Sequence, residues 1–467
     1  MLFSTTVMPP GYALARPAHE GMTCRHGRAC NGHWRVERNA AYSGCSMQAV
    51  HPSRTHVCVL GAGIVGLSCA WELVRAGMTV TVLDRAAEPA AGTSGANGAQ
   101  LSYAYVQPLA DPSIWRQLPK LLLARDSPLS LRLRLDPWQW AWGLRFLAAC
   151  RASVSRDSTV QLLQLAGESR AGFDAFLAEE RIDCDFSATG KLVLYASEDS
   201  FAGARRQLEL QRALGSVQAA LSAAECAQLE PALAHYAPRI AGAIHTPGEC
   251  AADCGKVCLE LARLLRARGV QFLLGEQARE LVQERGRVAA VRCTSGARVQ
   301  ADAFVLALGV DSPMLLRPLG LGAAWQVPVQ PLKGYSITVP ASAQPGAAPA
   351  VNVTDAARKV VFARLGDRLR IAGMAELTDT RDWAIAPRRI ASLLATARDV
   401  FPQGGEYAAA QSWAGLRPAT PRGLPVLGRL AQGPANLFMN TGHGALGFTL
   451  AFGSAQRVAQ QVRASNI

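Results

Sequence analysis

Regular hydrophobic patterning begins at residue 56. The short, valine-rich run "HVCVL" (56–60) is followed directly by the turn "GAGIVG" (61–66). The next residues place apolar side chains at helical spacing, and the face that they form consists of Ile64, Leu67, Ala70, Trp71 and Val74. The run "MTVTVLD" (78–84) then returns to a strand pattern. The order predicts a strand, a tight turn, a helix and a second, parallel strand.

The remainder of the chain mixes helical and strand patterns. Residues 152–240 alternate helical stretches with short strands such as "GKLVLYA", which is typical of an α+β region. Residues 270–309 read as short strands separated by glycine turns, and the last of them is fully apolar, as in the centre of a sheet. A new strand pattern starts at 328–340. Near the carboxyl end, a glycine-rich turn leads into an amphipathic helix.

Length and composition are those of a globular protein. The chain has 467 residues, of which 49% are hydrophobic and 18% charged, enough for two packed domains. Its net charge of +13 raises nucleic acid, an anionic membrane surface or anionic substrates as partners. The twelve cysteines are scattered and no compact signal core precedes them, so we expect a reduced, intracellular protein. No apolar run reaches the ~18 residues that a spanning helix needs.

Residues 1–55 differ from the rest. They contain six arginines, two acidic residues and four of the eight histidines, without a sustained apolar period. We expect a disordered extension or a leader, with a start at Met47 or an arginine-rich transit peptide as alternatives. Cys24, Cys30 and His33 lack a fourth ligand at finger spacing, so no metal site is expected.

The glycines of 61–66 suit a dinucleotide. Gly61 permits the tight turn, Gly63 lets the backbone approach a pyrophosphate, and Gly66 lets the helix pack closely on the strand. The phosphates then lie at the helix amino end, where free amide protons point at them. Asp84, 18 positions beyond Gly66, is well placed to accept from ribose hydroxyls. This unit alone leaves FAD and NAD both open.

The segment that follows is rich in polar side chains. "GTSGANGAQLS" (92–102) offers donors and acceptors for a long polar cofactor, which favours FAD; its polar residues are Thr93, Ser94, Asn97, Gln100 and Ser102. An ordinary surface loop explains the same composition equally well.

Residues 115–151 combine basic residues and tryptophan. The segment contains seven basic residues, two acidic residues and four of the nine tryptophans. Tryptophan beside arginine suits the headgroup boundary of a membrane, whereas the alternative is a tryptophan core with a solvated arginine face. Nucleic acid ranks last, because only 6% of the residues are aromatic and no nucleic-acid module is recognisable.

Three cysteines and two candidate site residues remain. Cys250, Cys254 and Cys258 stand four apart on one helical face, a spacing that favours buried thiols over an iron–sulfur cluster. Arg417 lies between Leu416 and Pro418 in "GLRP", and a rigidly held guanidinium can grasp a carboxylate in two places. His443 is more typical of a turn residue than of an acid or base. The helix amino end beside it would stabilise negative charge.

From about residue 57 to 455 the chain resembles the FAD enzymes of the D-amino acid oxidase and glycine/sarcosine oxidase superfamily, and within it the small subunit of bacterial D-amino acid dehydrogenases. Seven motifs carry the resemblance in order: "VLGAGIVGLSCAWEL", "TSGANGAQLSYAY", "LEPAL", "PLKGYS", "GMAE", "GLRPATPRGLPVLG" and "NTGHGALGFTLAFGS". The chain departs from the family in residues 1–55 and in "GECAADC", where relatives tend to be more acidic.

The resemblance implies an α/β fold with two domains. A Rossmann-type FAD-binding domain would comprise 56–105, 242–322 and 410–467, and a substrate domain 106–241 and 323–409. The substrate domain would be α+β, built on a mixed or antiparallel sheet.

The resemblance also implies site residues. Arg417 would bind the substrate carboxylate, with Tyr335 as a less securely placed partner. FAD would contact the glycine turn, the ribose acid and its neighbour, the polar segment, two strand ends and the second glycine turn: Val57, Leu60, Gly61, Ala62, Gly63, Ile64, Val65, Gly66, Asp84, Arg85, Ser94, Asn97, Gln100, Ala278, Ala307, Gly309, Gly442, His443 and Gly444. Covalent relatives attach flavin through a cysteine near the carboxyl end, whereas the last cysteine here is Cys293, so noncovalent FAD is expected.

The implied reaction is oxidative deamination of a D-amino acid to a 2-oxo acid and ammonia, by hydride transfer from Cα to flavin N5. No protein base is needed, because the site must only position the substrate. Electrons would pass to a quinone or another acceptor, with the enzyme in the cytoplasm and peripheral on the cytoplasmic face of the inner membrane through 115–151. The alternatives are an oxygen-using oxidase of glycine, sarcosine or another secondary amine, and a non-catalytic FAD-binding assembly subunit.

Overall fold

The computed structural model describes residues 54–106, 108–115, 129–131, 134–212, 217–380 and 382–465. The predicted extension, 1–55, and residues 116–128 of the basic tryptophan segment therefore lie almost entirely outside the described residues. Among the helices described, none has both the length and the apolar character needed to cross a bilayer. All nine cysteines of the described part are free and buried, including Cys250, Cys254 and Cys258 as predicted.

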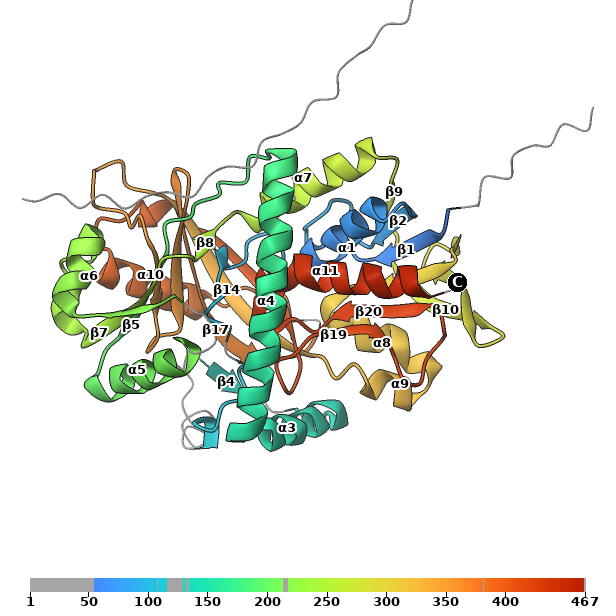
Figure 1. Cartoon of the computed structure of the whole chain (residues 1–467), viewed down its shortest axis with the longest axis horizontal. Coiled ribbons are helices and arrows are strands. Elements are labelled where there is room, and N and C mark those ends of the chain that lie inside the picture. Colours follow the sequence, from blue (N-terminus) through green and yellow to red (C-terminus); the bar gives the residue numbers. More distant parts are fainter. Residues whose placement is uncertain are drawn as a thin grey trace, which may run out of the picture. The chain divides into compact units, whose positions relative to one another are not determined.

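Two large sheets organise the described residues (Figure 1). The first has six strands in the order β19 (Val426–Arg429), β20 (Leu437–Thr441), β13 (Ala303–Leu306), β1 (His56–Leu60), β2 (Thr79–Asp84) and β9 (Gln271–Leu274). All neighbours are parallel except β19 and β20. The predicted βαβ unit is confirmed, because β1 and β2 pair in parallel on either side of helix α1 (Ile64–Arg75).

Helices cover one face of this sheet and a smaller sheet covers the other. The helices are α1, α4 (Ala152–Glu180), α7 (Cys254–Ala267) and α11 (Gly447–Ala464). The small sheet consists of β10 (Ala278–Glu284), β11 (Arg287–Cys293) and β12 (Arg298–Gln300), with α8 (Ser312–Leu316) and α9 (Leu321–Trp325) beside it. A strand covered on both faces must be apolar throughout, which explains the buried run of β13.

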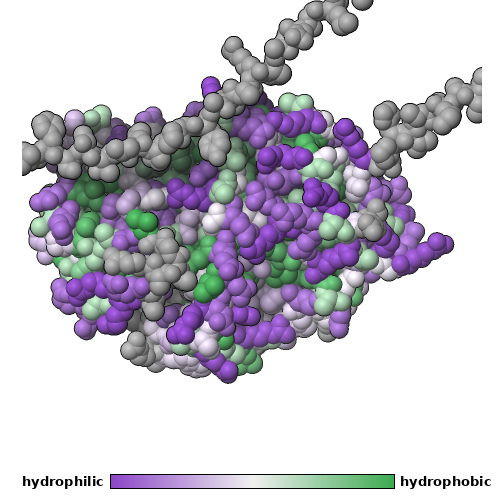
Figure 2. Space-filling view, in the orientation of Figure 1, coloured by the Kyte–Doolittle hydropathy of each residue, from purple (hydrophilic) through white to green (hydrophobic). Residues whose placement is uncertain are grey.

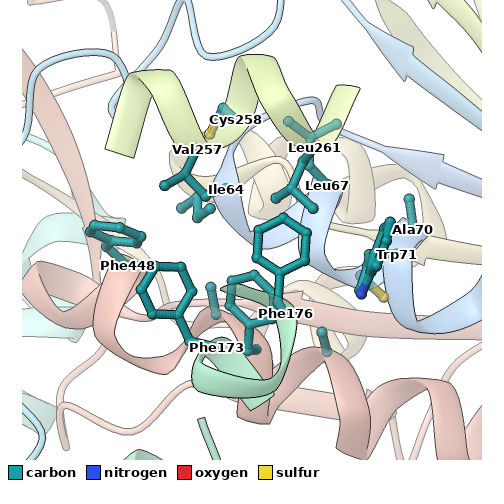
Figure 3. Packing of buried hydrophobic residues seen from close by; sticks show 14 of the residues in the cluster. Ile64, Leu67, Ala70, Trp71, Phe173, Phe176, Val257, Cys258, Leu261 and Phe448 are labelled. Atoms are coloured by element: carbon teal, nitrogen blue, oxygen red, sulfur yellow. The ribbon is translucent and has the colours of Figure 1, made fainter. Parts of the chain in front are cut away.

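Helix α1 packs between α7 and an aromatic cluster from α4 and α11 (Figure 3). Trp71 meets Phe176 of α4 edge to face, with ring centroids 5.1 Å apart. The predicted apolar face of α1 is confirmed, because Ile64, Leu67, Ala70 and Trp71 are all buried. The outward side of α4 is mainly hydrophilic in Figure 2. This packing fixes α1, and with it the glycine turn at its amino end.

The second sheet has nine strands and mixed directions, as expected for an α+β domain. Its path is β18 (Gln411–Ala419), β14 (Gln330–Pro340), β17 (Arg368–Leu377), β16 (Val360–Leu365), β15 (Asn352–Asp355), β5 (Lys191–Tyr195), β7 (Gly242–Thr246) and β6 (Ala219–Leu221), and β4 (Leu129–Leu131) pairs with β17. Around it lie α3 (Pro137–Ala149), α5 (Glu198–Arg212), α6 (Ala223–Leu229) and α10 (Pro387–Val400). A separate pair, β3 (Gln100–Leu101) and β8 (Cys250–Ala251), completes the strands.

Two strands lie on the other side of the domain boundaries expected from the sequence. β7 and β18 fall within 242–322 and 410–467, which we assigned to the cofactor domain, yet both pair within the nine-stranded sheet. The chain therefore crosses between the sheets after β7 and after β18, and not before them. We propose the two-domain division with these two strands moved to the substrate domain.

Candidate functional site

A cavity of about 1290 Å³ is lined by residues of both large sheets. This exceeds the roughly 300–1,000 Å³ of ordinary ligand pockets, so it has room for more than one small molecule. Arg417 and Tyr335 both border it, and so do the predicted cofactor residues except Val57, Leu60, Gly66 and Gly442. Val57 and Leu60 are fully buried within β1 instead.

The β1–α1 turn is shaped by missing side chains. Gly61 has φ +116°, and a Cβ there would lie 2.5 Å from the carbonyl oxygen of Ala307. A Cβ on Gly66 would lie 1.9 Å from the carbonyl oxygen of Gly61. Gly66 therefore shapes the site without lining it, because it lets α1 close against the turn, as the sequence predicted.

The amino end of α1 opens onto the cavity. Gly63 is its first flanking residue, and the Ile64 N–H donates to Ser94 Oγ at 3.0 Å. The remaining amides of the first turn and the helix dipole make this end suitable for phosphate. Gly63 lacks the Cβ that would fill the space before it, so a dinucleotide pyrophosphate fits this turn.

Asp84 ends β2 and holds the same turn. Its Oδ2 accepts from the Ala62 N–H at 2.6 Å, and its Oδ1 accepts from the Ala86 N–H at 2.8 Å. A carboxylate has about four acceptor positions, so both oxygens can still accept from ribose hydroxyls. Arg85 pairs with Asp311 at 3.0 Å across the cavity wall. Burial raises the pKa of Asp311, and Arg85 opposes that rise.

The predicted polar segment binds protein as well as lining the cavity. Asn97 Oδ1 accepts from the Ala99 N–H at 2.9 Å. Gln100 Nε2 donates to the carbonyl oxygens of Val353 and Phe362, both at 3.1 Å. Asn97 therefore holds the backbone of the segment itself, whereas Gln100 attaches the segment to the second sheet.

The second glycine turn brings a neutral histidine to the cavity. Gly442 and Gly444 have φ of +84° and +56° on either side of His443. His443 is buried, its Nε2 lies 3.1 Å from Ser454 Oγ, and burial lowers its pKa to about 3. At neutral pH the ring is uncharged. Beyond it, α11 begins at Gly447 with its positive end toward the cavity.

Arg417 reaches across a neighbouring strand. It lies on β18, whose partner is β14, and its Nη1 donates to the carbonyl oxygen of Met374 on β17 at 3.0 Å. A Cβ on Gly334, on the strand between, would lie 2.2 Å from Arg417 Nη2. Burial lowers the pKa of Arg417 to about 10, so the guanidinium stays charged at neutral pH. In the described residues, no hydrogen bond engages Nε or Nη2, which leaves two donors for a carboxylate.

Met374 supplies that carbonyl from an irregular backbone. The pairing of β14 with β17 shifts register between Lys333 and Tyr335, and Met374, opposite this shift, has φ +61°. Such a conformation is costly for a residue with a side chain and tends to occur at functional sites.

Tyr335 is directed elsewhere. It pairs with Ala414, whereas Arg417 pairs with Leu332, so strand alternation puts the two side chains on opposite faces of the sheet. The Tyr335 hydroxyl donates to Glu376 Oε2 at 2.5 Å, and Glu376 also binds Arg389. The structure thus gives Tyr335 a protein partner in place of the expected substrate carboxylate.

Sequence reasoning missed several cavity residues. Trp413 stands four positions before Arg417, and the period of two within "WAGLR" could have placed both on one face. Lys191 is buried, donates from Nζ to Ser102 Oγ at 2.8 Å, and has its pKa lowered to about 8 by burial. The sequence does not indicate that Met374 or Lys191 lines the cavity. A bulge in strand pairing positions Met374, and the contact with Ser102 positions Lys191.

The parallel sheet, its glycine turn and the acid at the end of β2 define a dinucleotide-binding protein, and the second sheet closes over the far end of that site. The chain belongs to the DAO family of FAD dependent oxidoreductases, which matches residues 56–461. It is therefore an FAD-dependent protein, and the glycine cradle described above fits that cofactor.

Relatives cover most of the chain. It is 46% identical over 408 residues to D-amino acid dehydrogenase 2 of Pseudomonas aeruginosa, which covers 87% of this chain and 94% of the relative. It is 45% identical over 416 residues to D-amino acid dehydrogenase 2 of Ralstonia nicotianae, with 87% and 96% covered.

Solved structures share the fold. Glycine oxidase from Geobacillus kaustophilus superposes with a TM-score of 0.68 at 22% identity, covering 89% of this chain and 96% of that one. Glycine oxidase from Bacillus cereus gives 0.67 at 20% identity, covering 88% and 95%. At such identities the likeness shows the architecture alone.

Proposed function

We propose that this protein oxidises D-amino acids to 2-oxo acids and ammonia. The observation that carries the proposal is the guanidinium of Arg417 beside the cofactor cavity, held at Nη1 by Met374 and, among the described residues, without a hydrogen-bond partner at Nε and Nη2. The names of relatives at 45–46% identity over most of the chain support the same substrate class. FAD supplies the chemistry of hydride acceptance when it is bound.

Noncovalent FAD would lie along the predicted residues. The Gly61–Gly66 turn would hold the pyrophosphate, Asp84 the ribose, and the turn around His443 the pyrimidine edge of the flavin. No cysteine borders the cavity among the described residues, and Cys293 is buried in β11. Both facts support a cofactor held without a covalent bond.

The chain's residues contribute positioning. Arg417 would bind the substrate carboxylate in two places and fix the direction of the Cα–H bond, which lowers the barrier by orientation. Of the described cavity-lining residues on β14, β17 and β18, Arg417 alone carries a charge. Buried His443 stays neutral and holds Ser454. These residues support a reaction in which the neutral amino acid needs no protein base.

The test is an anaerobic titration of the purified, FAD-loaded protein with a panel of D- and L-amino acids. Bleaching of the flavin absorbance by D-amino acids and not by their L-isomers is expected. A protein that binds FAD but is bleached by no amino acid would be the assembly subunit. In air, peroxide formation in place of dye reduction would indicate the oxidase.

We further propose that a quinone accepts the electrons and that the protein contacts the cytoplasmic face of the inner membrane. On α3 and just before it, Leu135, Trp140 and Leu144 are exposed, whereas Trp138 and Trp142 are buried. Trp138 and Trp142 thus belong to the core, as one interpretation of the sequence expected. Exposed Trp140 suits the membrane headgroup boundary that the other interpretation expected.

Vesicle binding tests the membrane proposal. The double substitution Trp140→Ser with Leu144→Ser should weaken sedimentation with anionic vesicles. Leu259→Ser is the control, because Leu259 is as exposed as Trp140 but lies on α7, at the opposite end of the view in Figure 1. Equal sedimentation of the double variant and the control would contradict the proposal.

A further inference from the structure

Two glycines pair directly across the strands that carry Arg417. Gly334 of β14 is opposite Gly415 of β18. Two pairs further along in one direction, Leu332 is opposite Arg417, and two pairs further in the other direction, Ser336 is opposite Trp413. Residues two apart on a strand share a face, so the side chains of Arg417 and Trp413 both start on the face of this glycine pair.

Both side chains lean over the glycines. A Cβ on Gly334 would lie 2.2 Å from Arg417 Nη2, and a Cβ on Gly415 would lie 2.1 Å from Trp413 Cη2. The Cβ positions of a cross-strand pair are about 4.5–5.5 Å apart. The edge of the indole therefore lies beside the guanidinium, and both groups lie over the backbone of Gly334 and Gly415.

The described cavity-lining residues around this pair on the three strands are uncharged, and the polar one on its face, Ser336, donates its hydroxyl to the carbonyl oxygen of Ala96. The other cavity-lining residues described on β14, β17 and β18 include Leu332, Met374, Ala375 and Ala419, and Trp383 also borders the cavity. None of them carries a charge, so a carboxylate or ammonium on the substrate side chain would lose water there without gaining a partner.

We infer that Trp413 contacts the substrate side chain and makes this a site for D-amino acids with apolar side chains. With the carboxylate on Arg417, a group attached at Cβ of the substrate lies within reach of the neighbouring indole. D-leucine or D-phenylalanine buries apolar surface on the ring, whereas D-alanine is too short to do so. This inference rests on the proposed function, since it takes Arg417 as the carboxylate site.

The substitution Trp413→Ala tests it by comparing two substrates. Flavin bleaching gives a reduction rate constant and a dissociation constant for each D-amino acid. The D-leucine to D-alanine ratio of rate constant over dissociation constant should fall at least about tenfold in Trp413→Ala. Trp413→Phe, which keeps an aromatic face, should restore most of the ratio.

Binding of unreactive acids provides a readout without catalysis. Propionate and 4-methylpentanoate have the carbon skeletons of alanine and leucine, and their binding is measured by the change in flavin absorbance. Trp413→Ala should weaken 4-methylpentanoate at least about tenfold more than propionate. If neither amino acid bleaches the wild-type flavin, the proposed reaction fails, yet this comparison still decides the role of Trp413.

The inference is overturned if, in a Trp413→Ala protein that retains FAD, D-leucine and D-alanine lose efficiency equally and 4-methylpentanoate and propionate lose affinity equally. It is also overturned if none of these values changes. Should Trp413→Ala lose FAD, Trp413→Phe and Trp413→Leu decide the matter. An unchanged leucine-to-alanine ratio in both of them would likewise overturn it.

Discussion

The carbonyl oxygen of Met374 accepts a hydrogen bond from Arg417 Nη1 across an intervening strand. The contact needs two irregularities: β14 has no side chain at Gly334, and Met374 has a positive φ. Together they fix the guanidinium so that, within the described part of the chain, Nε and Nη2 remain available as donors. The orientation of a substrate carboxylate follows from this contact.

Arg417→Met should remove the guanidinium while keeping a long apolar chain. We expect the efficiency of flavin reduction by a D-amino acid to fall about 100- to 1,000-fold, because a buried carboxylate loses its charged partner. Arg417→Lys should recover part of this loss only, since an ammonium cannot bind in two places. Stopped-flow reduction measures the efficiency, and unchanged FAD content is the control. An active Arg417→Met variant would contradict the assignment.

Gly334→Ala should act through Arg417. The new Cβ, 2.2 Å from Nη2, must displace the guanidinium, which is the flexible end of a side chain. We expect the dissociation constant of a carboxylate ligand to rise about tenfold or more, with little change in thermal unfolding. Gly167→Ala in α4 is the matched control, because no atom of the described residues lies within 4 Å of its new Cβ, apart from those of the glycine's chain neighbours and its own helix backbone. It should leave binding unchanged and stabilise the fold by about 0.5–1 kcal/mol.

Gly66→Ala and Gly63→Ala should separate folding from cofactor binding. A Cβ on Gly66 meets the backbone of Gly61 at 1.9 Å, so we expect a loss of about 1–3 kcal/mol in the free energy of unfolding and loss of FAD. Among the described residues, a Cβ on Gly63 meets Ser94 Oγ alone, at 3.2 Å, so this variant should stay folded and lose FAD without a loss of stability. Denaturation of the apoproteins and measurement of FAD content distinguish the two. Equal stability of both variants would be incompatible with these roles.

His443 should make the protein sensitive to acid. Its pKa is about 3 when folded, against an ordinary 6.5, so between these values the unfolded chain binds a proton that the folded chain does not. Stability must therefore fall as the pH falls through this window. By pH 4.5 this difference in proton binding at His443 lowers the free energy of unfolding by about 3 kcal/mol.

His443→Gln removes that proton and keeps a group able to hydrogen-bond Ser454. Urea denaturation from pH 7 to 4.5 should show a shallower loss of stability than in the wild type. The same substitution at exposed His235 serves as the control. Identical pH profiles for His443→Gln and wild type would refute the prediction.

The cofactor half of the fold could be predicted from the sequence because its signals are local. The spacing of Gly61, Gly63 and Gly66, the helical face after them and Asp84 at a strand end are all set within thirty residues. The pairing of β1 with β2 adds nothing that the βαβ pattern does not require.

The substrate half could be predicted only in part. The backbone of "PLKGYS" was recognisable, but a strand alternates faces, and the choice between Gly334 and Tyr335 for the face toward Arg417 depends on register. The bulge that turns the Met374 carbonyl is likewise a product of pairing between distant strands. For the same reason, the sequence could not indicate that β7 and β18 pair within the nine-stranded sheet.

Gln100 joins the two halves of the molecule through the carbonyl oxygens of Val353 and Phe362. A flavin that contacts residues 97–100 would therefore also affect the hydrogen bonds that Gln100 donates to the nine-stranded sheet. FAD binding would then be coupled to the ordering of the paired strands β15 and β16. Amide hydrogens far from the nucleotide would slow their exchange together with those that touch it.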